Sequence, residues 1–180
     1  MNPKNIIYAI NSTLNVDSMK NYAEQLSRLK IPSIFPSSLM RKIISLSQLL
    51  IGNIYEINQV KIRTNMSERD LLEFLSGIII TKGKEGSEII YKNHLGKIIH
   101  LNVITPIPKV VLDTTGAGDG YRAGLLSGKY IGLSLLDSCK VGSVISSFVV
   151  ETLGAQTQIF TMKDIKKRFK ETYGYTPSEL

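Results

Sequence analysis

The sequence predicts an α/β protein in which helices lie on both faces of a mainly parallel sheet. The first observation is that short apolar runs alternate with segments of helical periodicity through residues 5–80. Such alternation is typical of parallel strands joined by crossover helices. The second observation is a polar turn between two strand-like runs after residue 81, which predicts an antiparallel hairpin at one side of the sheet. Because ligands bind such folds at the carboxyl ends of the strands, functional residues are expected there.

The elements before the hairpin follow from composition and spacing. Residues 16–29 carry apolar side chains at spacings of three and four, which predicts an amphipathic helix. Ser67 and Asp70 have the spacing of a capping box, which predicts a helix that begins there and reaches Ser76. The other expected elements are strands at 5–10, 31–35, 49–51 and 78–80 and a helix at 38–47.

The rest of the chain is expected to hold the hairpin, a short strand-like run at 109–112 and then mostly helices. Two strand-like runs, at 88–92 and 97–105, flank the turn formed by residues 93–96. Helical patterns follow at about 118–131, 134–151 and 161–173.

Bulk composition predicts one domain over residues 1–180. The hydrophobic content of 43% is enough for one core in a chain of this length, which is short for two. The single cysteine, Cys139, is expected in the core, and with no leader pattern in the sequence the reducing cytoplasm is the expected compartment. No apolar run approaches the ~20 residues of a membrane-spanning helix, so no membrane partner is expected.

The formal net charge of +7 raises the question of a polyanionic partner. Basic residues are mostly dispersed and do not interleave with aromatic ones, so no nucleic-acid partner is expected. The one dense basic run lies at 163–170, where Ile165 and Phe169 are four residues apart, as on the buried face of a helix. This run is either a solvated surface helix or a polyanion-binding patch.

The clearest chemistry lies in the segment Asp113–Asp119, which reads Asp-Thr-Thr-Gly-Ala-Gly-Asp before a predicted helix. A turn of small residues at a helix N-terminus presents unpaired N–H groups at the positive end of the helix dipole, which suits phosphate. Asp119 either complements the dipole or accepts the proton of an attacking hydroxyl. Arg122 either contacts phosphate, faces solvent or pairs with Asp119. The overlapping Gly-x-Gly-x-x-Ala pattern at 118–123 lacks the second strand that a dinucleotide site needs.

This segment resembles the C-terminal signature of the ribokinase family of sugar and nucleoside kinases, also called the phosphofructokinase-B family. Two more motifs of that family lie upstream in the same order. Asn53 and Glu56 match its Asn-x-x-Glu motif, and residues 81–86 are similar to its Thr-x-Gly-x-x-Gly turn. All three motifs stand at the exits of predicted strands. The resemblance continues through residues 148–156, near the adenine and monovalent-cation region, and leans toward the prokaryotic adenosine-kinase-like branch.

The resemblance implies a three-layer α/β/α fold and ATP-dependent phosphoryl transfer to an alcohol of a sugar or nucleoside, with an adenosine-like acceptor favoured. Asp119 would be the catalytic base. The N–H groups of Gly116, Ala117 and Gly118 would stabilise the charge on the transferring phosphoryl group. The other implied site residues bind the nucleotide cofactor (Asn53, Glu56, Thr81, Gly83, Gly86 and Thr115), Mg²⁺ (Glu56) and K⁺ (Asp113 and Thr115).

Members of the family are considerably longer, and the resemblance implies that the chain lacks their N-terminal substrate-binding and lid portion. The acceptor therefore cannot be read from the residues present. The alternative hypothesis is a truncated or split-gene product that binds nucleotide or a partner chain and is inactive alone. Loss of half of the sheet would expose apolar edges, which favours a homo-oligomer or a complementary N-terminal chain as partner.

Overall fold

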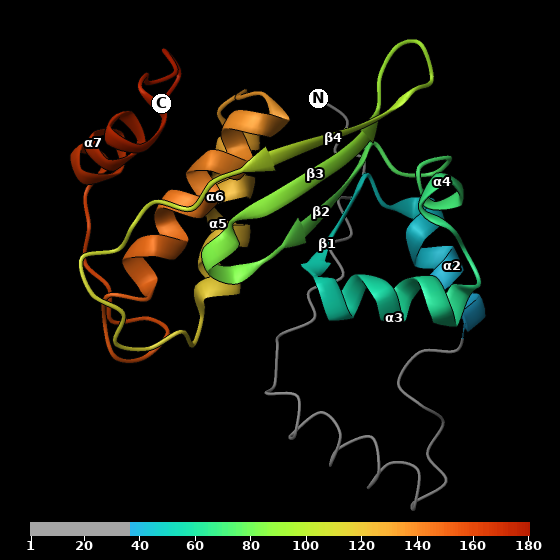
Figure 1. Ribbon diagram of the computed structural model, residues 1–180, viewed down its shortest axis with the longest axis horizontal. Helices are drawn as coiled ribbons and strands as arrows, with labels where there is room; N and C mark the ends of the chain where they lie inside the picture. Colours follow the sequence, from blue (N-terminus) through green and yellow to red (C-terminus); the bar gives the residue numbers. More distant parts are fainter. Residues whose placement is uncertain (1–36) are drawn as a thin grey trace, which may run out of the picture. The chain divides into compact units, whose positions relative to one another are not determined.

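The computed structural model describes residues 37–180 (Figure 1). The expected strands at 5–10 and 31–35 and the expected helix at 16–29 lie outside the described residues. In chain order the elements are α2 (Ser37–Leu46), β1 (Leu49–Asn53), α3 (Ile54–Thr64), α4 (Glu68–Leu71), β2 (Gly77–Thr81), the 3-10 turn η1 (Gly83–Glu85), β3 (Ser87–Lys92), β4 (Ile98–Val103), α5 (Ala117–Tyr130), α6 (Leu135–Val149) and α7 (Met162–Tyr173).

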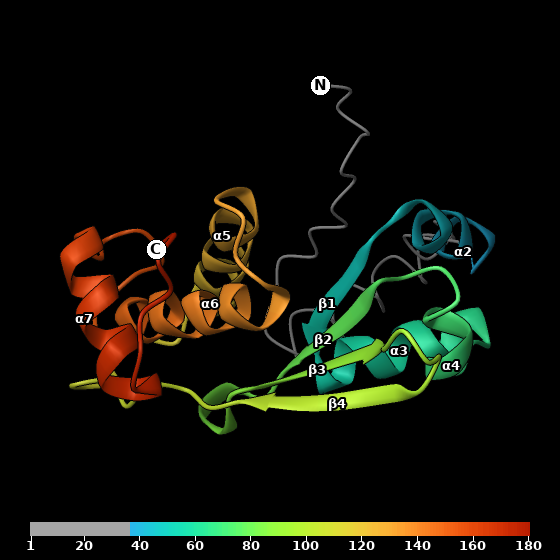
Figure 2. The ribbon, with the colours of Figure 1, turned by 90° about the horizontal axis from the view of Figure 1, so that it is seen from above.

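The described strands form one sheet in the order β1-β2-β3-β4. β1 and β2 run in the same direction, and the chain between them passes through α3 and α4 (Figure 1). β2, β3 and β4 then alternate in direction because short turns join them. Figure 2 shows the usual twist, since β1 and β4 point in clearly different directions. The sheet is mixed, and both the α/β class and the expected hairpin are confirmed.

The described chain forms two compact units. The first holds the described residues up to Ile80 together with Ile90–His100, and the second holds Thr81–Ile89 and Leu101–Leu180. The expectation of a single domain over residues 1–180 stays a prediction.

The first unit has an apolar core to which α2, α3, β2, β3 and the α4 region all contribute. Its buried members are Ile44, Ile57, Leu71, Leu72, Leu75, Ile78 and Ile90. Helix α3, which the sequence patterns above do not predict, begins with a reciprocal cap. Asn53 Oδ1 accepts the N–H of Glu56, and Glu56 Oε2 accepts the N–H of Asn53, both over 2.9 Å.

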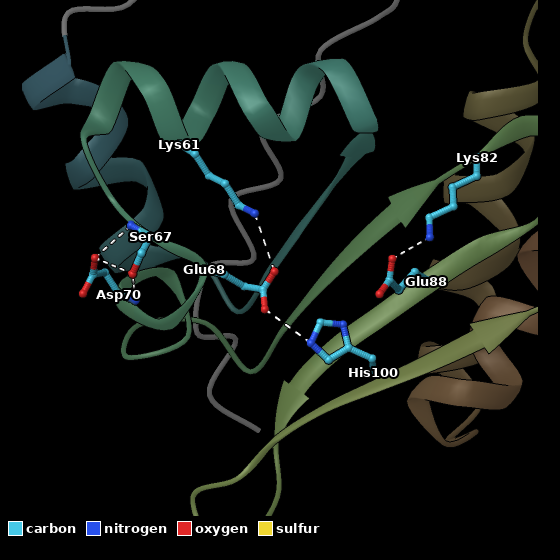
Figure 3. Close-up of polar contacts among 7 residues, drawn as sticks. All are labelled: Lys61, Ser67, Glu68, Asp70, Lys82, Glu88 and His100. Atoms are coloured by element: carbon cyan, nitrogen blue, oxygen red, sulfur yellow. Dashed lines mark hydrogen bonds and ion pairs between the residues drawn. The ribbon is translucent and has the colours of Figure 1, made fainter.

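The capping box at Ser67 is confirmed, but the helix that it opens is short. The Ser67 N–H donates to Asp70 Oδ2 over 2.8 Å, and the Asp70 N–H donates to Ser67 Oγ over 3.2 Å (Figure 3). Helix α4 ends at Leu71, not near Ser76 as expected, and a turn follows in which Leu75 is buried. After Leu72 the backbone bonds tighten from i→i−4 to i→i−3, from Glu73 to Asp70 and from Phe74 to Leu71, so the helix ends although Leu71 and Leu75 keep the helical spacing.

Glu68, the first residue of α4, lies between two bases of the same unit. Its Oε2 is 3.5 Å from Lys61 Nζ on α3, and its Oε1 is 3.5 Å from His100 Nε2 on β4 (Figure 3). His100 thus lies on the hairpin within 3.5 Å of a carboxylate oxygen.

In the second unit, α5 and α6 pack with almost no side chain between their backbones. A Cβ atom added to Gly124 would lie 2.7 Å from Gly142 Cα, and one added to Gly120 would lie 2.7 Å from Val149 Cγ2. A Cβ at Gly128 would lie 2.9 Å from Ser138 Cα. The glycines recur every fourth residue, so they share one face of α5 and allow this close approach.

Helix α7 follows the sequence prediction closely. Ile165 and Phe169 are buried in an apolar cluster with Leu133, Val141, Val144 and Leu180. The lysines of the basic run, Lys163, Lys166, Lys167 and Lys170, are exposed, as in the surface-helix alternative. Within the described residues, no helix is long and apolar enough to cross a membrane.

Candidate functional site

The start of α5 depends on a glycine in a left-handed conformation. Gly116 precedes the helix with φ 80° and ψ −3°. A Cβ at this position would lie 2.6 Å from the Cβ of Ala155, which belongs to the turn after α6. Only glycine fits both the dihedral angle and the space. The predicted phosphate-binding turn therefore packs against residues 148–156, the region in which the family resemblance continues.

Asp113 joins the same two turns through its carboxylate. Oδ1 accepts the N–H of Thr115 over 2.8 Å, and Oδ2 accepts the N–H of Gly154 over 2.9 Å. These N–H groups hold the pKa of the Asp113 carboxyl below its usual range, with the Thr115 backbone as the largest cause. Asp113 therefore connects the two turns structurally, independently of its expected role as a K⁺ ligand.

The three N–H groups expected to hold a phosphoryl group are not equivalent. The Ala117 N–H donates to the carbonyl of Thr114 over 3.2 Å. The Ala117 N–H therefore has to leave the Thr114 carbonyl before it can donate to a ligand. The first helical hydrogen bond runs from the Gly120 N–H to the Gly116 carbonyl over 2.8 Å, so the helix begins where the sequence predicts.

Asp119 and Arg122 form an ion pair on the first turn of α5. Arg122 Nη1 lies 2.8 Å from Asp119 Oδ1, and the exposed fractions are 61% for the aspartate side chain and 15% for that of the arginine. Of the three alternatives left open for Arg122, the structure shows the pairing. The guanidinium also lies beside Gly118, where an added Cβ would be 3.7 Å from Nη1. A carboxylate this exposed can meet a substrate hydroxyl.

The turn between β2 and β3 follows the Thr-x-Gly-x-x-Gly pattern. The Lys82 N–H donates to the Gly86 carbonyl over 2.7 Å and closes the turn. Gly86 has φ 91°, and a Cβ there would lie 2.0 Å from the Val103 carbonyl oxygen, so no other residue fits. Lys82 Nζ pairs with Glu88 Oε2 over 2.6 Å across the turn (Figure 3).

A cavity of about 460 Å³ in the second unit brings this turn together with the start of α5. The turn contributes Thr81, Gly83, Lys84 and Gly86, and the α5 region contributes Thr114, Ala117, Gly118 and Tyr121. The opposite walls are formed by Thr105, Pro106, Ile107, Pro108 and Val111 and, on α6, by Ser143, Ser146, Ser147 and Val150. Two motifs that are distant in sequence therefore line one space.

The α6 and proline walls are the parts of the cavity that the sequence patterns do not single out. Ser143, Ser146 and Ser147 lie three and four residues apart, which places them on one helix face, but this spacing is common. Ser143 is almost completely buried within this face.

The third motif belongs to the other unit and shows a different use. Asn53 and Glu56 are engaged with each other as the cap of α3. Their expected contacts with nucleotide phosphate and Mg²⁺ stay a prediction. Among the described residues no group of three or more His, Cys, Asp or Glu side chains is placed to hold a metal. Mg²⁺ bound to ATP needs fewer protein ligands than that, because phosphates and water supply the others.

The expectation that each motif follows a strand holds for two of the three. In the described chain no strand lies between Val103 and Ala117. Residues 110–112 are exposed, and the backbone here is attached to the end of α6 by the N–H of Leu112, which donates to the Val150 carbonyl over 2.8 Å. The apolar run is therefore held by a helix end and not by a neighbouring strand.

The fold is of the ribokinase type, and comparison with known proteins gives the family. The model of the pfkB family of carbohydrate kinases matches residues 6–162, so the chain belongs to this family. The nucleoside kinase of Methanothermobacter thermautotrophicus is 34% identical over 145 residues, which are 80% of this chain and 45% of that protein. The nucleoside kinase of Methanocaldococcus jannaschii is 34% identical over 76% of this chain and 44% of its own length.

Solved structures agree with this assignment. The crystal structure of the M. jannaschii nucleoside kinase, an archaeal member of the ribokinase family, matches with a TM-score of 0.71 and 31% identity over 76% of this chain and 44% of that one. The Burkholderia thailandensis nucleoside kinase in complex with ADP-inosine matches with a TM-score of 0.75 and 26% identity over 89% of this chain and 52% of that one. The chain thus spans about half the length of these relatives.

Proposed function

We propose that this chain provides the ATP-binding and catalytic end of a kinase that phosphorylates an alcohol of a nucleoside or sugar. The main support is the cavity, which is lined by both the Thr81–Gly86 turn and the start of α5. Asp119 directly follows the cavity-lining Gly118. A helix N-terminus beside a cavity with two glycine-rich turns suits the phosphates of a nucleotide.

In the proposed reaction, Asp119 accepts the proton of the acceptor hydroxyl. The hydroxyl oxygen forms a bond to the γ-phosphorus of ATP, the bond from that phosphorus to the bridging oxygen breaks, and ADP leaves. The N–H groups at 116–118 stabilise the negative charge on the transferring group. The Arg122 guanidinium pairs with the Asp119 carboxylate until the acceptor hydroxyl takes the place of the guanidinium.

Two ions would complete the site. Mg²⁺ would neutralise charge on the ATP phosphates, and Glu56 would be its ligand, as the family motif implies. Asp113 and Thr115 would hold K⁺. Their carboxylate and hydroxyl oxygens are hard donors of the kind that such a cation binds, and the carboxylate also accepts the N–H groups of Thr115 and Gly154.

A nucleoside acceptor, adenosine-like in the first place, is favoured over a free sugar. Two relatives that are 34% identical to this chain are named nucleoside kinases. The test is ADP formation by the purified chain with ATP, Mg²⁺ and either adenosine, inosine or ribose. Turnover with a nucleoside and none with ribose supports the proposal, and the reverse order contradicts the nucleoside assignment.

Asp119→Asn should abolish turnover and leave ATP binding largely intact. The matched control is Asp137→Asn, because Asp137 is the third residue of α6 as Asp119 is of α5, but does not follow a cavity-lining residue. Turnover per folded molecule should survive in the control. Unchanged activity of the Asp119 variant would contradict its role as base.

A second candidate function follows from the share of the relatives that the chain covers, which is 45% and 44% of the two nucleoside kinases. On this reading the chain binds nucleotide and needs a complementary chain, or a second copy of itself, for turnover. Light scattering gives its mass in solution alongside the ADP assay. Robust turnover by a monomer rejects this candidate, whereas ATP binding without turnover supports it.

A further inference from the structure

One wall of the cavity is a short segment that is stiff by its own chemistry. Thr105, Pro106, Ile107 and Pro108 follow β4 and line the cavity. Each proline fixes its own φ and restricts the residue before it to extended conformations, so all four residues are constrained. A stiff segment of this kind is positioned as a whole once its two ends are held.

The first end is held by the last residue of α7. The Tyr173 hydroxyl donates to the carbonyl of Ile104 over 2.9 Å. The tyrosine ring packs edge-to-face on Phe169, with 4.9 Å between ring centroids, and Phe169 is fully buried. Burial raises the pKa of the Tyr173 hydroxyl, so it stays a protonated donor at neutral pH.

The second end is held through Glu151, just beyond α6. Its Oε1 accepts the backbone N–H of Lys109 over 2.7 Å. Arg168 of α7 contacts both oxygens of the same carboxylate, with Nη2 at 2.9 Å from Oε1 and 3.1 Å from Oε2. Only 11% of the Arg168 side chain and 13% of the Glu151 side chain are exposed. Such a largely desolvated, hydrogen-bonded pair is costly to break.

Arg168 is itself fixed on its other sides. Its Nη1 donates to the hydroxyl of Ser147, a cavity-lining residue of α6, over 3.0 Å. Its guanidinium lies over the Phe148 ring, 3.5 Å from the centroid, and that ring stacks on Phe160. A guanidinium held on three sides has a fixed position, so it can fix the Glu151 carboxylate more firmly than a flexible lysine could.

We propose that α7, which carries none of the family motifs, positions the wall formed by residues 105–108 and thereby sets the affinity of the cavity for its ligand. Tyr173 and the Arg168–Glu151 pair are the positioning residues, and they act at the two ends of the wall. That the ligand is ATP rests on the proposed function, whereas the positioning itself does not.

The first test follows the wall in the chain without ligand, by hydrogen–deuterium exchange of single amides. In Arg168→Gln, exchange of the Lys109 amide should rise about tenfold or more, because its acceptor is no longer held in place. Exchange at Val144 in the core of α6 should stay unchanged. An unchanged Lys109 amide, or an equal rise at Val144, would overturn the proposal, since the second outcome means general destabilisation.

The second test measures ATP binding to the same chain by calorimetry. Arg168→Gln and Tyr173→Phe should each weaken binding, by about tenfold for the arginine variant and less for the tyrosine variant, which loses only one hydroxyl. Arg168→Lys should recover part of the loss, because it keeps the charge without the forked geometry. Lys167→Gln is the matched control: it removes the same charge from a side chain that is 74% exposed, and it should bind like wild type.

The two tests separate the two proposals. A wild-type chain that does not bind ATP contradicts the proposed function, and the Lys109 amide still decides whether α7 positions the wall. A chain that binds ATP equally well with and without Arg168 contradicts the inference and leaves the proposed function intact. Tyr173→Phe keeps the inference testable if the arginine variant does not fold.

Discussion

The backbone N–H of Gly154 donates to Asp113 Oδ2 over 2.9 Å, across 41 residues of sequence. The same carboxylate accepts the N–H of Thr115 over 2.8 Å through its other oxygen. One side chain therefore connects the turn after α6 to the turn before α5. The first aspartate of the family signature has a folding task as well as its expected task at an ion.

Asp113→Asn should lower stability at neutral pH and much less in acid. The pKa of Asp113 is lowered in the folded state, so its stabilisation is fully present above the unfolded value near 4 and is lost as the pH falls through the folded value. Urea unfolding of both proteins should give a clear difference at pH 6 that shrinks below pH 3. A difference independent of pH would show that the carboxylate charge is not the cause.

Gly116→Ala should destabilise the second unit through both strain and collision. The left-handed φ of 80° costs about 1–2 kcal/mol for alanine, and the 2.6 Å approach to Ala155 Cβ adds to this. Gly132→Ala is the matched control, because Gly132 has φ 92° but nothing within 4 Å of an added Cβ. Urea unfolding should show the larger loss at Gly116. Equal losses of stability in the two variants would mean that the turn at residue 116 shifts to make room, so that the approach to Ala155 adds no cost.

Gly124→Ala should lower the free energy of unfolding by about 1–3 kcal/mol, although alanine is the better helix former. The added Cβ would meet Gly142 Cα at 2.7 Å and force α5 and α6 apart. Gly118→Ala has only an ordinary 3.7 Å contact with Arg122 Nη1, and it should be neutral or stabilising. Thermal unfolding of the two variants checks the contrast, and a stabilised Gly124 variant would contradict the tight packing.

Asn53→Ala should lower stability by about 1 kcal/mol, the usual cost of losing an N-cap side chain. Glu56→Gln should cost less, because an amide oxygen can still accept the N–H of Asn53 in the reciprocal cap. If Glu56 also holds Mg²⁺, the same variant should lose Mg²⁺-dependent ATP binding while its urea midpoint hardly moves. Loss of stability and binding in equal proportion would point to the cap alone.

Signals within one or two helical turns were enough to predict much of the fold. The ends of β1, β2, β3, α5 and α7 and the hairpin turn lie within two residues of the predicted ones, because caps, glycines and alternating patterns act locally. The capping box at Ser67 was predicted in the same way. The Asn53–Glu56 spacing carried the same kind of signal, but it was interpreted as a ligand motif, and α3 was missed.

The remaining differences come from contacts between distant segments. Helix α4 ends at Leu71, before the buried Leu75, and residues 110–112 form no strand; the Leu112 N–H donates to the Val150 carbonyl. The serine and proline walls of the cavity depend on how α6 lies beside the segment after β4. No spacing within a single segment encodes contacts of this kind, so the sequence patterns predicted the two glycine-rich turns that line the cavity and not its other walls.

The close packing of α5 on α6 also limits how the candidate site can move. With Gly120, Gly124 and Gly128 pressed against the backbone and small side chains of α6, α5 can neither roll nor slide along its neighbour without collision. Any adjustment of the Asp113–Gly118 turn to a ligand has to come from rotation of its own peptide groups, beginning with the Ala117 N–H, or from movement of both helices as one body. Slow motions of α5 and α6 should therefore share a single exchange rate.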